Sequence, residues 1–143
     1  MAVTIRDAGP ADAEAIANLL TQLGYSADPG RVPARLERLA IVGDRVVVAE
    51  ADGKVAGLAH LQVTPTIEHD RPVAKIGALV VEESRRGTGV GRALVDALEG
   101  EARGRGCGVL FLTTAERRDD AHLFYERVGF AHTGRRYSRT LSQ

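Results

Sequence analysis

Three glycines alternate with other residues in the middle of the chain, at Gly87, Gly89 and Gly91. Because glycine has no β carbon, the backbone of such a turn bends sharply and approaches a ligand closely. Arginines stand at both edges of the turn, at Arg86 and Arg92. Backbone amides and guanidinium groups gathered in this way bind anions, so a phosphate or pyrophosphate is the expected ligand.

The residues on either side predict a strand before the turn and a helix after it. Residues 73–81 form a mostly apolar run that fits a strand. After the turn, apolar residues recur at the spacing of one buried helix face, namely Val90, Ala93, Leu94, Ala97 and Leu98. The turn then lies at a helix N-terminus, where unpaired N–H groups favour negative charge. For the turn alone, a glycine-rich helix start without a ligand is the alternative.

Two common nucleotide-binding motifs do not fit this turn. A P-loop requires a lysine followed by Ser or Thr, whereas Arg92 and Ala93 follow the last glycine. A dinucleotide-binding turn has the spacing G-x-G-x-x-G and an acidic residue about 20 positions further on. Here the spacing is G-x-G-x-G, and the next strand end, near residues 112–114, carries no acid.

The pattern that fits is R-x-x-G-x-G, formed by Arg86, Gly89 and Gly91. It resembles the acetyl-CoA pyrophosphate loop of the GCN5-related N-acetyltransferases, the GNAT superfamily. A second stretch, AHLFYERVGF at residues 121–130, is similar to that family's A-x-x-F/L-Y-x-x-x-G-F element. Two motifs in the right order are more specific than either alone. Residues 118–125 and 137–141 also show a weaker likeness to the aminoalkylphosphonate N-acetyltransferase subset.

The expected elements follow the order of that family over nearly the whole chain. The resemblance implies one α/β domain over residues 1–143, with a mixed, mostly antiparallel central sheet flanked by helices in the order β-α-α-β-β-β-α-β-α-β. We expect strands at residues 3–6, 45–50, 55–64, 73–81, 109–113 and 130–141, the fifth of them buried. Helices are expected after Pro10, from Pro33, from Gly89 to about Arg103, and from Asp119 to Gly129.

The resemblance also implies acetyl-CoA as co-substrate and a set of residues that bind it. Free backbone amides at a splayed strand end, at Leu79, Val80 and Val81, would bind the acetyl carbonyl and the pantetheine arm, with the Val81 N–H as the oxyanion donor. Tyr125 corresponds to the general acid that protonates the CoA sulfur, with a core aromatic as the alternative. The pyrophosphate would be held by Arg86 and the amides of Gly87, Thr88, Gly89, Val90, Gly91 and Arg92.

A general base is harder to assign from the sequence. An alkylammonium must lose a proton before it attacks a thioester. Several family members place a glutamate three residues before the position of Val81, but this chain has Ala78 there. The candidates are Glu82 acting through water, water itself, or the loop residues Glu68, His69 and Asp70. Each of these side chains is also typical of a solvated loop.

The other histidines and the cysteine give no sign of a further site. His60 and His132 have no neighbours at metal-ligand spacing, so no metal is expected. His122 is expected at a helix surface or in packing. Cys107 lies between glycines without a motif that would make it a nucleophile.

Composition limits the class of protein. Hydrophobic residues make up 44% of the chain and charged residues 27%, as in an ordinary globular domain. No apolar run approaches the ~20 residues of a membrane helix, and no dense basic stripe indicates nucleic acid. A single cysteine and the lack of a signal-peptide pattern indicate a cytoplasmic protein without disulfides.

The expected function is acetyl transfer from acetyl-CoA to a primary amine of a small molecule or peptide, by direct attack in a ternary complex. The alternative is a non-catalytic acyl-CoA-binding sensor or regulatory module, which would keep the fold without turnover. Members of the family often dimerise, so the resemblance leaves a homodimer open, although no segment of the sequence indicates one.

Overall fold

A computed structural model of the chain describes residues 2–113, 119–134 and 136–141. The chain forms two compact units, Met1–Phe111 and Leu112–Gln143. The larger unit contains almost all of the regular structure. Its elements are β1 (Val3–Asp7), the 3-10 turn η1 (Pro10–Asp12), α1 (Ala13–Leu23), η2 (Pro29–Arg31), α2 (Val32–Ile41), β2 (Arg45–Ala51), β3 (Lys54–Thr64), β4 (Val73–Val81), η3 (Glu83–Arg85) and α3 (Val90–Gly104), followed by the strand β5 (Val109–Leu112).

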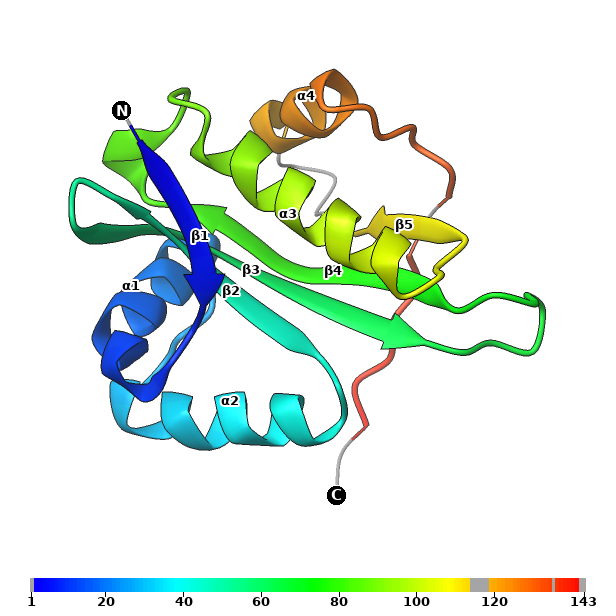
Figure 1. The fold of residues 1–143 in the computed structure, drawn as a ribbon, viewed down its shortest axis with the longest axis horizontal. Coiled ribbons are helices and arrows are strands. Elements are labelled where there is room, and N and C mark those ends of the chain that lie inside the picture. The colour runs from blue at the N-terminus through cyan, green and yellow to red at the C-terminus, as the bar shows by residue number, and fades with distance from the viewer. Residues whose placement is uncertain (1, 114–118, 135, 142–143) are drawn as a thin grey trace. The chain divides into compact units, whose positions relative to one another are not determined.

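The strands form one five-stranded sheet in the order β1-β2-β3-β4-β5. The first three pairs are antiparallel. Figure 1 shows the β4 and β5 arrows pointing the same way, with α3 as the crossover between them. The sheet is therefore mixed and mostly antiparallel, as the sequence predicted.

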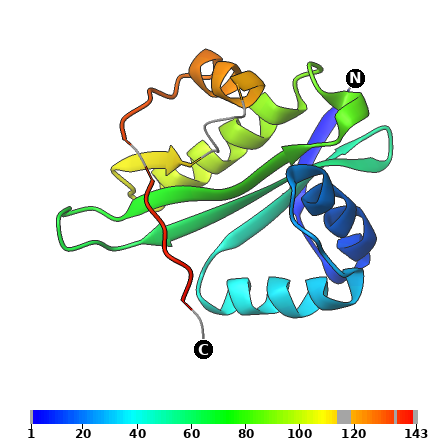
Figure 2. The same cartoon turned by 180° about the vertical axis from the view of Figure 1, so that it is seen from behind.

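Helices cover both faces of this sheet in the larger unit. Figures 1 and 2 show α1 and α2 on one face and α3 on the other. On the α1 face, Leu58 and Val80 belong to a buried cluster with Ile16, Ala17, Leu19, Val32 and Val48. On the α3 face, Val90, Leu94 and Leu98 are fully buried, as their spacing predicted. Because both faces are covered, β3 is almost continuously apolar instead of alternating with polar residues.

A β-bulge interrupts the β3–β4 ladder near its centre. His60 pairs with Ala78, but Leu61 pairs with Ile76, so Gly77 is an extra residue on β4. A β carbon added to Gly77 would lie 2.7 Å from Nδ1 of His60. Glycine at this position therefore makes room for the His60 side chain.

An ion network fixes the N-terminal turn that leads into α1. The Arg6 guanidinium contacts Asp12 at 2.8 Å and Glu50 at 3.0 Å. Asp12, a buried carboxylate, also accepts the N–H of Gly9 at 2.8 Å. The hydrogen bond from Arg6 holds the pKa of the Asp12 carboxyl below its usual value, and the same contacts raise the pKa of Arg6. The network joins β1, η1 and β2.

In the described part of the smaller unit there is one helix, α4 (Asp119–Arg127). Gly129 follows it with φ +102°. The strand expected at residues 130–141 is not formed in the described part of that stretch. The large apolar side chains of Tyr137 and Leu141 bury little surface there, since they are 89% and 86% exposed. The expectation that 109–113 is a buried strand was also wrong, because β5 is an edge strand and exposes Val109 and Phe111.

Candidate active site

The glycine turn joins the end of β4 to α3 through η3. Gly87 has φ +78° and Gly89 has φ +94°, a left-handed backbone conformation that other residues rarely adopt. Nothing lies within 4 Å of the points where their β carbons would be. The backbone of the turn is therefore exposed, with open space above it.

The amides that follow the turn are oriented for an anion. The first hydrogen bond of the α3 pattern runs from the Ala93 N–H to the Gly89 carbonyl, at 3.1 Å. The N–H groups of Val90, Gly91 and Arg92 thus precede the paired part of a 15-residue helix. The positive end of the helix dipole adds to their attraction for negative charge. These groups fit a pyrophosphate.

Arg86 connects this turn with the end of β4. Its Nε donates to the Val81 carbonyl at 3.3 Å. Both Arg86 and Arg92 are exposed. Among the described residues, no carboxylate forms an ion pair with either of them. Their positive charge is thus available to a ligand at the turn.

The register of β4 decides which of its end amides face a ligand. The Glu82 N–H donates to the Ala56 carbonyl at 2.8 Å, and Val81 lies opposite Gly57. Antiparallel pairing alternates along the ladder, so the N–H groups of Leu79 and Val81 point away from β3, whereas that of Val80 points toward it. The Val80 side chain is part of the core.

The neighbouring strand β5 begins beside the start of β4. The Gly108 N–H donates to the Pro72 carbonyl at 3.0 Å. Within the described residues, β5 has four residues against nine in β4. Leu79 and Val81 lie toward the other end of β4, close in sequence to the glycine turn. This difference in length fits the expected splayed strand end.

Glu82, the first candidate for the base, caps η3. Its carboxylate accepts the Ser84 N–H at 2.9 Å and a short hydrogen bond from the Ser84 hydroxyl. The hydroxyl bond is the main reason why the pKa of Glu82 lies below its usual value, with help from the Ser84 N–H and the nearby charges of Arg85 and Arg86. A lowered pKa makes this carboxylate a weaker base.

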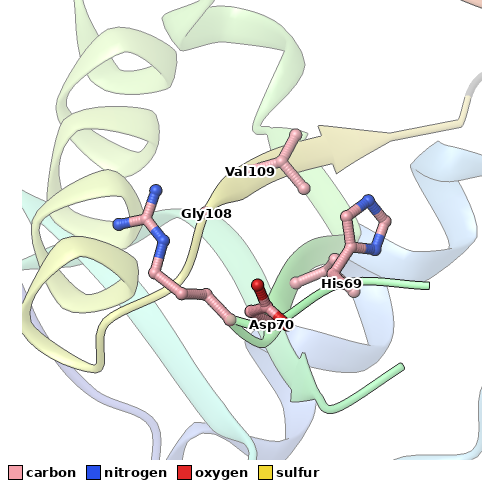
Figure 3. A pocket seen from close by; sticks show the side chains of 6 residues that line it. His69, Asp70, Gly108 and Val109 are labelled. Atoms are coloured by element: carbon pink, nitrogen blue, oxygen red, sulfur yellow. The ribbon is translucent and has the colours of Figure 1, made fainter. Parts of the chain in front are cut away.

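The loop candidates lie at the opposite end of β4 from the glycine turn. His69 and Asp70 line a pocket of about 380 Å³ with Arg71, Val73, Gly108 and Val109 (Figure 3). His69 contacts the hydroxyl of Thr66 at 2.8 Å, and Glu68 lies 3.5 Å from its ring. At ~3.3 Å per residue, the nine residues of β4 place this pocket roughly 26 Å from Val81. The fold separates these side chains from the glycine turn.

A second pocket, of about 100 Å³, lies between the sheet and the first two helices. We call it the α2 pocket. His60 and Ala78 form part of its lining, together with Ile16, Leu20, Val32, Arg35, Leu36, Leu39, Val46 and Leu58. His60 Nε2 lies 2.8 Å from Asp44 Oδ2, and both side chains are largely buried.

Sequence reasoning missed this His60–Asp44 pair. The two residues are 16 positions apart, so no local motif joins them. The only available signal was the hairpin of residues 45–64, whose register brings His60 opposite Val46, two residues after Asp44.

Tyr125 belongs to α4 in the smaller unit. Its ring makes edge-on contacts with Phe124, at a centroid distance of 5.6 Å, and with Phe130, at 6.3 Å. The Phe130 N–H donates to the Tyr125 carbonyl at 2.9 Å. The role of the hydroxyl stays a prediction, and the side chains of the expected capping residues Asp119 and Asp120 lie outside the described part of the chain.

None of the described helices is long and apolar enough to cross a membrane. In the same residues, no group of three or more His, Cys, Asp or Glu side chains is arranged to hold a metal ion.

The mixed sheet and the left-handed glycine turn before α3 are the features that the resemblance to an acetyltransferase fold implied. The sequence profile of the Acetyltransferase (GNAT) family matches residues 14–130, most of the chain. The chain belongs to the GNAT family of acetyltransferases. The resemblance inferred from the two motifs is thereby confirmed.

Curated relatives with similar sequences are N-acetyltransferases. The chain is 31% identical to an aminoglycoside N(6')-acetyltransferase type 1 of Stenotrophomonas maltophilia, over 94% of this chain and 90% of that protein. It is 33% identical to the aminoalkylphosphonate N-acetyltransferase of Salmonella typhimurium, over 66% of this chain but only 61% of that protein. It is also 33% identical to a glucosamine 6-phosphate N-acetyltransferase of Trypanosoma brucei brucei, over 68% and 65%.

Solved structures share the fold over the full length. A putative acetyltransferase from Agrobacterium tumefaciens has a TM-score of 0.86 and 28% identity, and covers 96% of this chain and 99% of its own. A Trypanosoma brucei acetyltransferase has a TM-score of 0.83 and 26% identity, with coverage of 98% and 100%. The α/β class predicted from the sequence is thus the observed one.

Proposed function

We propose that the protein is an acetyl-CoA-dependent N-acetyltransferase that acetylates a primary amine of a small molecule by direct attack in a ternary complex. The observation that carries the proposal is the left-handed turn at Gly87 and Gly89, directly before the unpaired amides of α3. The family match spans both compact units, so we further propose that residues 1–143 act as one catalytic domain.

In this proposal the chain supplies groups that hold the cofactor and groups that act on the thioester. The turn amides and Arg86 hold the pyrophosphate. The Val81 N–H, which points away from β3, donates to the thioester oxygen and stabilises the charge that develops on it when the amine attacks. Tyr125 returns a proton to the departing sulfur. The lone cysteine supports a cytoplasmic location.

The α2 pocket is our candidate for the acceptor site. Its volume of about 100 Å³ suits a small amine better than a folded protein. Arg35 is one of its lining residues, and a positively charged residue there favours an acceptor that also bears an anionic group. Two of the relatives are named for such acceptors, an aminoalkylphosphonate and a sugar phosphate. We therefore place aminophosphonates and amino-sugar phosphates first in an acceptor screen, ahead of aminoglycosides, polyamines and peptides.

Calorimetry with acetyl-CoA tests the proposal. We expect a single site in the wild-type protein and no binding in Gly89→Trp, because the large side chain fills the space above the turn. Gly106→Trp is the matched control: Gly106 is also left-handed with open space, but it follows the other end of α3. No binding of acetyl-CoA by the wild-type protein at millimolar concentration contradicts the proposal.

Release of CoA thiol over the amine library then separates the two functions. An enzyme releases thiol with at least one acceptor. A protein that binds acetyl-CoA but releases thiol with no amine is the sensor or regulatory module instead.

A further inference from the structure

We propose that His60, oriented by Asp44, is the general base that removes a proton from the acceptor ammonium. The inference rests on the proposed N-acetyl transfer and adds a catalytic residue to it. Asp44 is a positioning residue, because it acts through the imidazole.

The position of His60 in the α2 pocket supports this role. His60 lies directly across the β3–β4 ladder from Ala78, and both residues line the α2 pocket. Ala78 is three residues before Val81 on β4, which corresponds to ~10 Å along the strand. A proton acceptor in the lining of the proposed acceptor pocket can take the proton of an ammonium bound there, before the amine reaches the thioester.

The contact with Asp44 decides which ring nitrogen of His60 carries the proton. The Asp44 carboxylate, 2.8 Å from Nε2, accepts a hydrogen bond from that nitrogen and so fixes the tautomer with Nε2 protonated. Nδ1 then carries the free electron pair, and no described residue forms a hydrogen bond with it. The side chains of His60 and Asp44 are only 15% and 9% exposed, so the pair is held in one place.

The bulge in β4 makes room for the imidazole. A β carbon on Gly77 would lie 2.7 Å from Nδ1 and overlap the ring. The extra residue in β4 is a glycine, so the ring keeps the position in which it contacts Asp44.

The proton balance of the reaction closes with this assignment. His60 Nδ1 takes one proton from the ammonium and later passes it to water. The amine nitrogen then forms the C–N bond, and the C–S bond breaks with its electron pair on sulfur. The thiolate gains a proton from the general acid, and the second proton that the nitrogen loses as the amide forms restores that acid, so one proton is released overall.

The charged groups around His60 come from three elements. Asp44 precedes β2 and lies 2.8 Å from the ring. Arg35 on α2 lines the pocket, and Lys75 on β4 lies opposite Gln62, on the same face of the sheet as His60.

The test compares two kinds of nucleophile in His60→Gln. A primary alkylamine is protonated at neutral pH and needs a base, whereas methoxyamine is already unprotonated. We expect kcat/KM for the alkylamine to fall about 100-fold or more, and that for methoxyamine to change less than about threefold. Calorimetry should give an unchanged affinity for acetyl-CoA. His69→Gln, at the other end of β4, is the control and should leave both rates unchanged.

A rescue and a second variant extend the test. Adding Ala78→Glu to His60→Gln places a carboxylate across the ladder from the lost imidazole and should restore part of the alkylamine rate. Asp44→Asn should lower the alkylamine rate and leave the methoxyamine rate unchanged, whereas a merely structural role of Asp44 would lower both rates.

Two results would overturn the assignment: equal losses for the two nucleophiles in His60→Gln, or an unchanged alkylamine rate. Either leaves the proposed acetyl transfer standing. If the wild-type protein releases thiol with no amine, the proposed function and this inference fail together.

Discussion

Gly57 on β3 lies in direct contact with Leu94 on α3. A β carbon on Gly57 would be 2.9 Å from Leu94 Cδ1 and 3.0 Å from Val90 Cγ1. Both partners are fully buried and cannot move toward solvent. This close approach sets the position of the first turns of α3 over the sheet, and with it the position of the glycine turn relative to the end of β4.

Replacing Gly57 by alanine should therefore lower the free energy of unfolding by about 1–3 kcal/mol, because the added methyl overpacks a closed interface. Gly100→Ala is the matched control. Gly100 lies within α3 with nothing near its β position, so alanine there should stabilise the protein by about 0.5–1 kcal/mol. Urea denaturation measures both changes, and a destabilising effect of equal size in the two variants contradicts the packing argument.

Arg86→Met should weaken acetyl-CoA binding about three- to tenfold, because an exposed charge-assisted contact to phosphate is lost along with the hydrogen bond to the Val81 carbonyl. The loss should shrink as salt is added, since exposed charges are screened. Arg103→Met, at the far end of α3 and paired with Glu99, is the control. Calorimetry at two salt concentrations checks both points, and equal effects of the two substitutions contradict a specific role for Arg86.

Asp12→Asn should make the protein less stable at neutral pH by about 1–3 kcal/mol, since a buried charged hydrogen bond is removed. Arg6 lowers the pKa of Asp12 in the folded state, so this stabilisation is present above the unfolded pKa of ~4 and is lost as pH falls through the folded pKa.

The difference in stability between wild type and Asp12→Asn should accordingly narrow as the pH is lowered below ~4. Thermal unfolding over that range measures it. Asp7→Asn is the comparison: its carboxylate pairs with Arg45 but is 74% exposed, so its substitution should change stability little. If the difference in stability between wild type and Asp12→Asn stays constant with pH, the ionised Asp12 carboxylate is not its cause.

Tyr125→Phe should reduce kcat about 100-fold while leaving the affinity for acetyl-CoA intact, because only the proton donor is removed. The aromatic contacts with Phe124 and Phe130 do not use the hydroxyl. Tyr137→Phe, whose side chain is highly exposed, serves as the control. Stopped-flow and steady-state measurements separate chemistry from binding, and an unchanged turnover rules out the general-acid role.

Much of the fold, and the glycine turn of the candidate site, could be predicted from the sequence. Helix ends at Gly24 and Gly129, and the turn at Gly89, all have the positive φ that glycine allows. The apolar face of α3 formed by Val90, Leu94 and Leu98 is buried, as its spacing predicted. These features are local: a few neighbouring residues determine the backbone conformation and the apolar face.

The exposure of β5 and the places of the other candidate residues depended on tertiary structure. The chain order did not show that β5 would expose Val109, that the described part of residues 130–141 would form no strand, or that His69 would lie at the far end of β4 from the glycine turn. Each of these depends on which segments pair and how far their ladders extend.

The sequence by itself determined the glycine turn before a helix, the order of the elements as far as α4, and the family, because these depend on short-range spacing. Only the tertiary structure placed His60 beside Asp44 and opposite Ala78. That placement requires strand register between residues far apart in the chain, together with one bulge at Gly77. A shift of one residue in that register would have turned the His60 side chain to the other face of the sheet.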